Sequence, residues 1–227
     1  MSAEWENYDG LKEFVFDRNG SLFGVAEIDP FKDRFLLSPS ELRGLTHGIS
    51  VGTALSRSVF EGIIDRPTLL YKWHYRQANN FLDGLAFLLT QYINAKGFRA
   101  LPIPASQIVD WEAQKGCVSH RALAEAAGLG WRGKNNLLVN DMYGSQVRLV
   151  SVLTDMPLLT DRPVENGCGN CRRCVSACPA SALGEEADAY DLKKCYDHLS
   201  VFSKMPGIGQ HICGLCVKAC PGKANMK

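Results

Sequence analysis

The stretch Cys168-Gly-Asn-Cys-Arg-Arg-Cys-Val-Ser-Ala-Cys-Pro179 decides how the last quarter of this chain folds. A shorter copy follows it as Cys213-Gly-Leu-Cys-Val-Lys-Ala-Cys-Pro221, and Cys195 lies alone between the two. Three cysteines with two residues between each and the next, followed by a fourth cysteine directly before proline, have the spacing with which bacterial ferredoxins hold [4Fe–4S] clusters. The segment is therefore predicted to carry two such clusters.

The spacing also predicts which cysteine serves which cluster. In the ferredoxin run, three close cysteines hold one cluster and the cysteine before proline ligates the other. The first cluster is accordingly assigned to Cys168, Cys171, Cys174 and Cys220. The second is assigned to Cys178, Cys195, Cys213 and Cys216. Cys195 supplies the ligand that the incomplete second run lacks, so each of the eight cysteines is used once.

Disulfide bonds and structural zinc are the competing uses of so many cysteines. Disulfides require an oxidising compartment, and the opening Met-Ser-Ala-Glu-Trp-Glu has neither the basic nor the apolar region of a secretion signal. A structural zinc site usually joins two Cys-x2-Cys pairs about 12–20 residues apart, which a triple run closed by proline does not match. The sequence favours clusters and a cytoplasmic location.

Length and composition describe an ordinary globular chain. Its 227 residues suggest one or two domains, and a hydrophobic content of 46% is sufficient for a buried core. A formal net charge of +1 provides no overall attraction to nucleic acid or to an anionic membrane. No apolar run approaches the ~20 residues that a membrane-spanning helix needs, so a membrane protein is not expected.

Before the cysteines, helix and strand patterns alternate. The longest periodic segment, 68–96, has apolar residues near i, i+3, i+4 and i+7 and is predicted to be a core helix. Further helices are expected at 8–18, about 40–44, and 119–127. Strands are expected at 21–28, 47–55, 98–103, 137–139 and 146–153. The segment from Pro104 to Gly116 has no clean period and is predicted to be a loop.

A glycine-rich block, Gly128-Leu-Gly-Trp-Arg-Gly-Lys-Asn135, follows the helix predicted at 119–127. Three glycines in six residues allow the backbone to approach a ligand closely, and Lys134 adds a cation. The block is neither a Walker A sequence nor a dinucleotide fingerprint. A tight helix-to-strand turn explains the same glycines, so a ligand site and a purely structural turn both stay open.

Several of these segments together resemble one known family. They are Arg121-Ala-Leu-Ala124, Ala127-Gly-Leu-Gly-Trp131, Gly133-Lys-Asn135, Tyr143-Gly-Ser145, Leu153-Thr-Asp155 and the cysteine segment, in that order. In this combination the sequence resembles the epoxyqueuosine reductase family, which is related to the corrinoid-binding core of reductive dehalogenases. The resemblance covers about residues 118 to 221 well and the first hundred residues loosely.

The resemblance implies an architecture and a chemistry. The fold would be α/β (α+β), with a nitroreductase-like, corrinoid-binding-type module over residues 1–160 and a double-cluster ferredoxin-like module over 161–227. The clusters would pass electrons to a corrinoid such as cobalamin or to a small-molecule substrate in the first module. The corrinoid or substrate pocket would include Gly128, Gly130, Trp131, Lys134 and Asn135. A ferredoxin or flavodoxin is the implied electron donor.

Two departures from the family pattern affect the expected substrate. In the family an aspartate assists proton delivery while an epoxide on a tRNA base is reduced, but its position here is Gln114. Asp110 is the neighbouring carboxylate that we take as the candidate catalytic acid. The chain also ends seven residues after Cys220, without the helical-repeat domain that helps longer members hold tRNA. Together with the near-neutral charge, this predicts that tRNA is not a partner.

Two functions from different classes therefore stay open, and a tRNA-modifying enzyme proper is a third possibility, which an absence of tRNA binding at low salt would exclude. The first is an iron–sulfur oxidoreductase that resembles a short epoxyqueuosine reductase. The second is a non-catalytic, ferredoxin-like electron-transfer or maturation partner, which Gln114 at the aspartate position favours. The ninth cysteine, Cys117, is predicted to be a buried or partly buried free thiol in either case.

Overall fold

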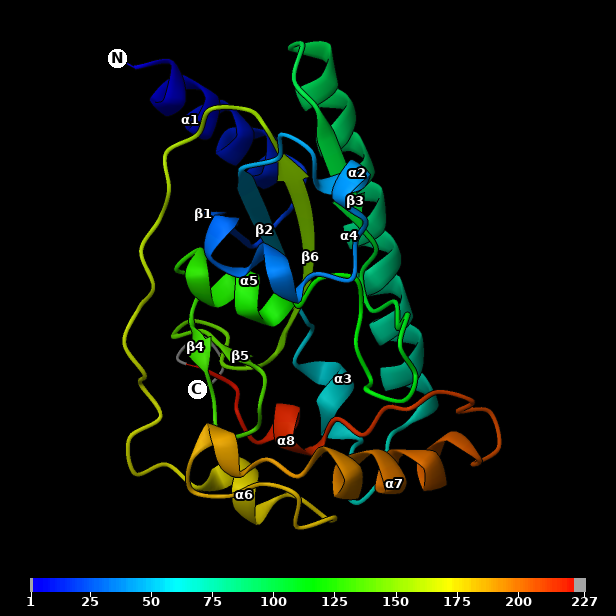
Figure 1. The fold of residues 1–227 in the computed structure, drawn as a ribbon. Coiled ribbons are helices and arrows are strands. Elements are labelled where there is room, and N and C mark those ends of the chain that lie inside the picture. Colours follow the sequence, from blue (N-terminus) through cyan, green and yellow to red (C-terminus); the bar gives the residue numbers. More distant parts are fainter. Residues whose placement is uncertain (1, 223–227) are drawn as a thin grey trace. The chain divides into compact units, whose positions relative to one another are not determined.

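The computed structural model describes residues 2–222, which form two compact units (Figure 1). The first unit comprises the chain up to Thr53, Asn79–Leu129 and Arg148–Val164. The second comprises Ala54–Ala78, Gly130–Val147 and the chain from Glu165 onward. The functional modules 1–160 and 161–227 stay a prediction, since the compact units are assembled from other ranges. Among the described residues, no helix is long and apolar enough to cross a membrane.

A four-stranded sheet forms the centre of the first unit. Its strands, in spatial order, are β1 (Leu22–Glu27), β2 (His47–Ala54), β6 (Val147–Thr154) and β3 (Ala100–Ile103). β1 pairs antiparallel with β2 in a register that places Leu22 opposite Gly52, and β3 pairs antiparallel with β6. Each strand lies within two residues of its predicted range. Short apolar runs of strand length therefore predicted these segments correctly.

Helices cover both faces of this sheet (Figure 1). Helices α1 (Ala3–Phe16) and α4 (Leu69–Ala95) pack on one face, where Leu11, Ile49 and Leu89 join one buried apolar core. Helix α5 (His120–Ala126) lies against the other face. A side chain at Gly48 would collide there with Leu123, so glycine permits the close contact.

The predicted helices are present, with one displaced end. α4 and α5 agree with the expected 68–96 and 119–127, and α2 (Pro39–Leu42) with the expected 40–44. α1 begins five residues earlier than predicted, because the Ser2 hydroxyl caps it by accepting the Trp5 amide at 3.3 Å. A 3-10 helix, η1 (Asp29–Arg34), follows β1.

The second unit contains short elements. Strands β4 (Trp131–Arg132) and β5 (Leu138–Val139) form a small antiparallel pair. The helices are α3 (Ser58–Glu61), α6 (Arg173–Ser176), η2 (Ala187–Ala189), α7 (Leu192–Ser203) and α8 (Leu215–Lys218). α4 contributes its first residues, through Ala78, to this unit. Its apolar core joins Phe60, Ile63 and Tyr71 to Ile208 and Leu215.

Candidate functional site

Two short helices position the cysteines of the second unit. α6 contains Cys174 and α8 contains Cys216, and in each case the cysteine before proline follows the alanine that caps the end of the helix. α6 and α8 pack against each other. The Arg173 side chain donates to the carbonyl of Ala219 at 3.0 Å and so joins α6 to the end of α8. This repeated helix pair lets the cysteine before each proline approach the other run.

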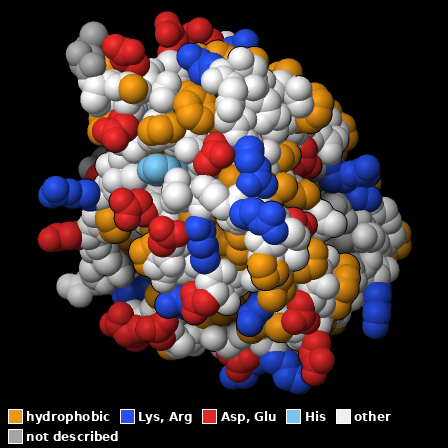
Figure 2. Space-filling view, turned by 45° about the horizontal axis from the view of Figure 1, so that its top comes forward, with side chains coloured by type: hydrophobic (Ala, Val, Ile, Leu, Met, Phe, Trp, Pro, Cys, Tyr) orange, Lys and Arg blue, Asp and Glu red, His pale blue; other side chains and the backbone are white. Residues whose placement is uncertain are grey.

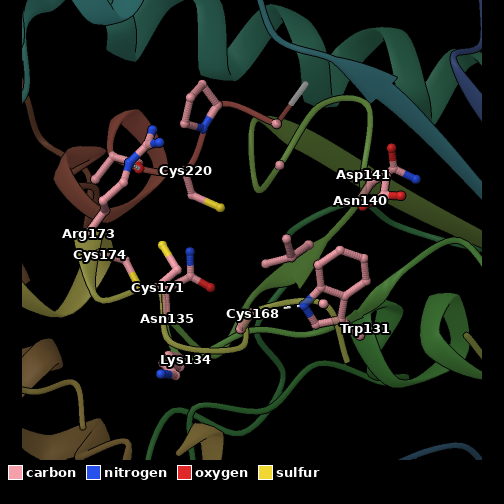
Figure 3. A pocket seen from close by; sticks show the side chains of 16 residues that line it. Trp131, Lys134, Asn135, Asn140, Asp141, Cys168, Cys171, Arg173, Cys174 and Cys220 are labelled. Atoms are coloured by element: carbon pink, nitrogen blue, oxygen red, sulfur yellow. Dashed lines mark hydrogen bonds between the residues drawn. The ribbon is translucent and has the colours of Figure 1, made fainter. Parts of the chain in front are cut away.

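The thiols of Cys168, Cys171, Cys174 and Cys220 line one cavity of about 220 Å³ (Figure 3). Burial raises the pKa of Cys174 to about 11, and the charges of the other three thiols add to this rise. Burial likewise raises the pKa of Cys220, which Cys168 and Cys171 increase further. The structure therefore brings together the four cysteines that the spacing assigned to the first cluster. We call them the first set.

The remaining four cysteines also interact with one another. Burial raises the pKa of Cys216, and Cys213, Cys195 and Cys178 are the next largest causes. Burial raises the pKa of Cys213 to about 11, with further contributions from Cys195 and Cys178. Cys195, which lies in α7, thus joins the incomplete second run. We call these four the second set.

The chemistry of the two sets suits clusters. All nine cysteines are free thiols. Within residues 2–222, no three Cys, His, Asp or Glu side chains lie close enough to hold a single metal ion. A cubane cluster is larger than one ion, and each of its irons takes a different thiolate, so its ligands stand further apart than those of a zinc site.

Three residues of the glycine-rich block line the same cavity as the first set. The indole Nε1 of Trp131 donates to Cys168 Sγ at 3.3 Å, as the dashed line in Figure 3 shows. Lys134 is buried, and its Nζ donates at 2.9 Å to the carbonyl of Gly169, between Cys168 and Cys171. Asn135 is also buried, and its Nδ2 donates to Ser145 Oγ at 3.0 Å.

The two remaining glycines that were singled out meet protein backbone. A Cβ at Gly130 would stand less than 3.0 Å from the carbonyl oxygen of Val139, so glycine is required where β4 and β5 pair. Gly128 lies in the first unit with φ +70°, close to the carbonyl of Arg162. The sequence left a ligand site and a structural turn as two explanations of these glycines. At both positions the described contacts are those of a structural turn.

Tyr190 is a neighbour of the second set that sequence reasoning missed. It is hydrogen-bonded to Cys195, and its pKa is raised, first by burial and then by this bond. The backbone amide of Ala182 donates to Cys178 Sγ at 3.4 Å in the same set. No sequence pattern indicated Tyr190, because the contact depends on how the segment before α7 folds back.

The candidate acid Asp110 lies in the first unit, in the predicted loop. Its Oδ1 accepts the amide of Ala113 at 2.9 Å, and its backbone pairs with that of Lys115. Gln114, at the family's aspartate position, has φ +53° and donates its side-chain amide to the carbonyl of Trp111. The described contacts of Asp110 therefore shape its own loop. Cys117 lies in the same unit and is half-buried.

Curated relatives with similar sequences are epoxyqueuosine reductases, although no family model matches the chain. The enzyme of Salmonella typhimurium is 30% identical over 201 residues, which are 82% of this chain and 49% of that protein. The enzyme of Gloeobacter violaceus is 41% identical over 116 residues, 47% of this chain and 36% of that protein. The chain thus spans about half the length, or less, of these relatives.

Solved structures of the same fold include epoxyqueuosine reductases and a reductive dehalogenase. An epoxyqueuosine reductase crystallised with a stem loop of tRNA-Tyr has a TM-score of 0.64 at 23% identity, over 94% of this chain and 64% of that one. A catabolic reductive dehalogenase in complex with 3-bromo-4-hydroxybenzoic acid has a TM-score of 0.79 at 19% identity, over 96% of this chain and 32% of that one. Together with the curated relatives, these matches confirm the predicted resemblance and the mixed α/β fold.

The prediction that tRNA is not a partner was wrong. The epoxyqueuosine reductase of the same fold was solved with a tRNA stem loop, which overturns the argument from net charge. A net charge of +1 is a sum over 25 basic and 24 acidic residues and says nothing about their distribution. Figure 2 shows Lys and Arg side chains interspersed with Asp and Glu on the face that it draws. The position of the last residue is no argument against tRNA either.

Proposed function

The chain is a relative of the epoxyqueuosine reductases, and on this premise we propose that it is an iron–sulfur oxidoreductase of tRNA queuosine modification. The observation that carries the proposal is the grouping of eight cysteines into two sets of four. Each set would hold one [4Fe–4S] cluster in a ferredoxin-like arrangement. When bound, such clusters supply single electrons at low potential. The electron donor that we propose is a ferredoxin or flavodoxin.

The residues that line the cavity fit an inorganic cluster. Four thiols face a volume of about 220 Å³, and pockets for organic ligands usually measure about 300–1,000 Å³. We therefore assign the cavity beside Trp131, Lys134 and Asn135 to the cluster of the first set. Elsewhere in this chain, cobalamin is supported by the resemblance and by the likeness to the dehalogenase fold.

The substrate that we propose is an epoxide on a tRNA base. Removing the epoxide oxygen as water to leave an alkene consumes two electrons and two protons. Two thiolate-bound clusters that each carry one electron would supply the two electrons that the reaction consumes. Asp110 is the proposed proton donor, and its role requires the carboxylate to come within hydrogen-bond reach of the substrate.

Iron and sulfide analysis of anaerobically purified protein tests the two clusters. We expect about eight irons and eight sulfides per chain, as two [4Fe–4S] clusters require. Cys171→Ala and Cys195→Ala should each retain about half of the iron, because they remove ligands from different sets. Cys117→Ser is the matched control and should retain all of it. Stoichiometric zinc, or full iron in both ligand variants, would refute the assignment.

Turnover separates the enzyme from the second candidate, an electron-transfer or maturation partner, which Gln114 favours. Reduced protein would be incubated with tRNA that contains epoxyqueuosine, with and without added cobalamin, and the nucleosides analysed by mass spectrometry. Queuosine formation above the protein-free control supports the enzyme, and dependence on cobalamin supports the corrinoid. A fully loaded protein that forms no queuosine, yet reduces an acceptor protein, supports the partner.

A further inference from the structure

The indole of Trp131 points its only polar group at a thiol of the first set. Its Nε1–H donates to Cys168 Sγ at 3.3 Å, and both residues line the cavity of that set. An indole can donate one hydrogen bond and accept none. The interaction therefore has one direction, from the ring toward the sulfur (Figure 3).

Contacts with neighbouring chain segments fix both ends of this hydrogen bond. Trp131 pairs with Val139 in the two-stranded sheet, which fixes the start of its side chain. A Cβ at Gly167 would lie 2.8 Å from Cη2 and 2.9 Å from Cζ2 of the indole, so the ring lies directly against the backbone that precedes Cys168. At the other end, the Cys168 amide donates to Asn166 Oδ1 at 2.8 Å. The contacts of both chain segments therefore hold the indole ring next to the Cys168 sulfur.

Reduction of a cluster adds negative charge that is shared with its sulfur ligands. A hydrogen bond to such a sulfur stabilises the reduced state more than the oxidised state, and hydrogen bonds to the sulfurs are one of the factors that set cluster potentials. Lys134 acts in the same direction, because its buried ammonium group lies beside the loop between Cys168 and Cys171. The Glu185 carboxylate, 3.7 Å from Lys134 Nζ, offsets part of this charge. The cavity side of the first set therefore carries two positively polarised donors.

We propose that Trp131 is a positioning residue that orients Cys168 and raises the reduction potential of the cluster held by the first set. This inference rests on the proposed function, since it needs the first set to hold a cluster. It gives the glycine-rich block a role toward the thiols instead of the corrinoid or substrate role that the resemblance implied.

The test is Trp131→Phe, which keeps an aromatic ring and removes the N–H. Redox titration followed by electron paramagnetic resonance should show one of the two potentials lowered and the other unchanged. We expect the ratio of reduced to oxidised first cluster to fall about tenfold at fixed potential, equivalent to about 59 mV. Trp73→Phe is the matched control, because Trp73 is 58% exposed in the same unit, and it should shift neither potential.

The iron content separates the possible failures. Absence of clusters from the wild-type protein would sink the proposed function itself. A Trp131→Phe protein with about eight irons and both potentials unchanged would overturn the role of Trp131 and leave the proposed function standing. If Trp131→Phe loses about half of the iron, the role of Trp131 is tested on the wild-type protein instead. With ¹⁵N-labelled indole, coupling of the nitrogen to one cluster by electron–nuclear double resonance supports the proposal, and its absence overturns it.

Discussion

Gly144 shows how one position determines whether a thiol reaches its set. It has φ +58°, and a Cβ there would stand within 3.0 Å of the Cys220 carbonyl oxygen. The adjacent Ser145 amide donates to that same carbonyl at 3.0 Å. The turn that contains Gly144 therefore lies directly against the backbone of Cys220, at a backbone conformation that glycine adopts without strain.

We expect Gly144→Ala to displace Cys220 and to retain about half of the iron, because the first set would lose one ligand. Iron analysis and electron paramagnetic resonance would measure the loss. Gly84→Ala is the control, since Gly84 lies in α4 and a Cβ there meets nothing within 4 Å. It should keep all the iron and raise the unfolding free energy by about 0.5–1 kcal/mol. Full iron in Gly144→Ala would contradict the argument.

At the scale of elements, His120 connects the start of α5 to two other segments of the first unit. Its Nε2 lies 3.0 Å from the carbonyl of Pro104, and its Nδ1 lies 2.8 Å from Ser151 Oγ in β6. Because a carbonyl only accepts, Nε2 carries the proton and Nδ1 accepts from the Ser151 hydroxyl. The neutral ring therefore ties the loop after β3 to α5 and β6.

This arrangement predicts a pH dependence of stability. Burial lowers the pKa of His120, the Arg148 charge lowers it further, and the bond to Pro104 and the charge of Asp83 oppose the change. With a folded pKa below the unfolded value near 6.5, the unfolded chain binds the proton first as pH falls. The contribution of neutral His120 is thus present above about pH 6.5 and is lost below it.

His120→Gln should test this by thermal unfolding of the anaerobic protein between pH 7.5 and 5.5. We expect the free energy of unfolding of the variant at pH 7.5 to be lower by about 1–3 kcal/mol, because the Ser151 hydroxyl or the Pro104 carbonyl loses its hydrogen-bond partner. Its stability should fall less than that of the wild type toward pH 5.5. His47 and His74 also have lowered pKa values, so the difference between the two proteins isolates His120. Parallel pH curves would refute the assignment.

Local patterns predicted α1, α2, α4, α5 and the strands of the four-stranded sheet, but not the short helices α3, α6 and α8 or the way the elements assemble. Helix α4 was predictable because apolar residues recur along its whole length, whereas the first turn of α1 carries Glu4 and Glu6 and no apolar period. The cysteine grouping was predictable because ligand spacing is a chemical constraint within a short segment. The contact of Trp131 with Cys168 joins residues that are 37 positions apart in the chain. Hydrophobic periodicity describes a single helix or strand and therefore cannot predict such a contact.

At the scale of the whole molecule, the described units differ in what stabilises them. The first has a continuous apolar core that includes Leu11, Val51, Leu89 and Val152. In the described segment 165–204 of the second, the buried hydrophobic residues are Cys174, Ala182 and Phe202. Burial of apolar surface supplies most of the folding free energy of a domain, so this segment has little of its own. Its order should therefore depend on the clusters that the two sets are proposed to hold.

Removal of the clusters should consequently release 165–204 and leave the first unit folded. Hydrogen exchange would compare anaerobic, iron-loaded protein with protein stripped by oxidation and chelation. Amides of α1, β2 and β6 should keep their protection, because their core needs no metal, while amides of α6 and α7 should exchange much faster. Mutating one ligand from each set, Cys171→Ala with Cys195→Ala, should reproduce the stripped pattern without any chelator. Unchanged protection of α6 and α7 in both samples would show that 165–204 is held by packing alone, whereas equal loss in α1, β2 and β6 would show that the metal stabilises the first unit as well.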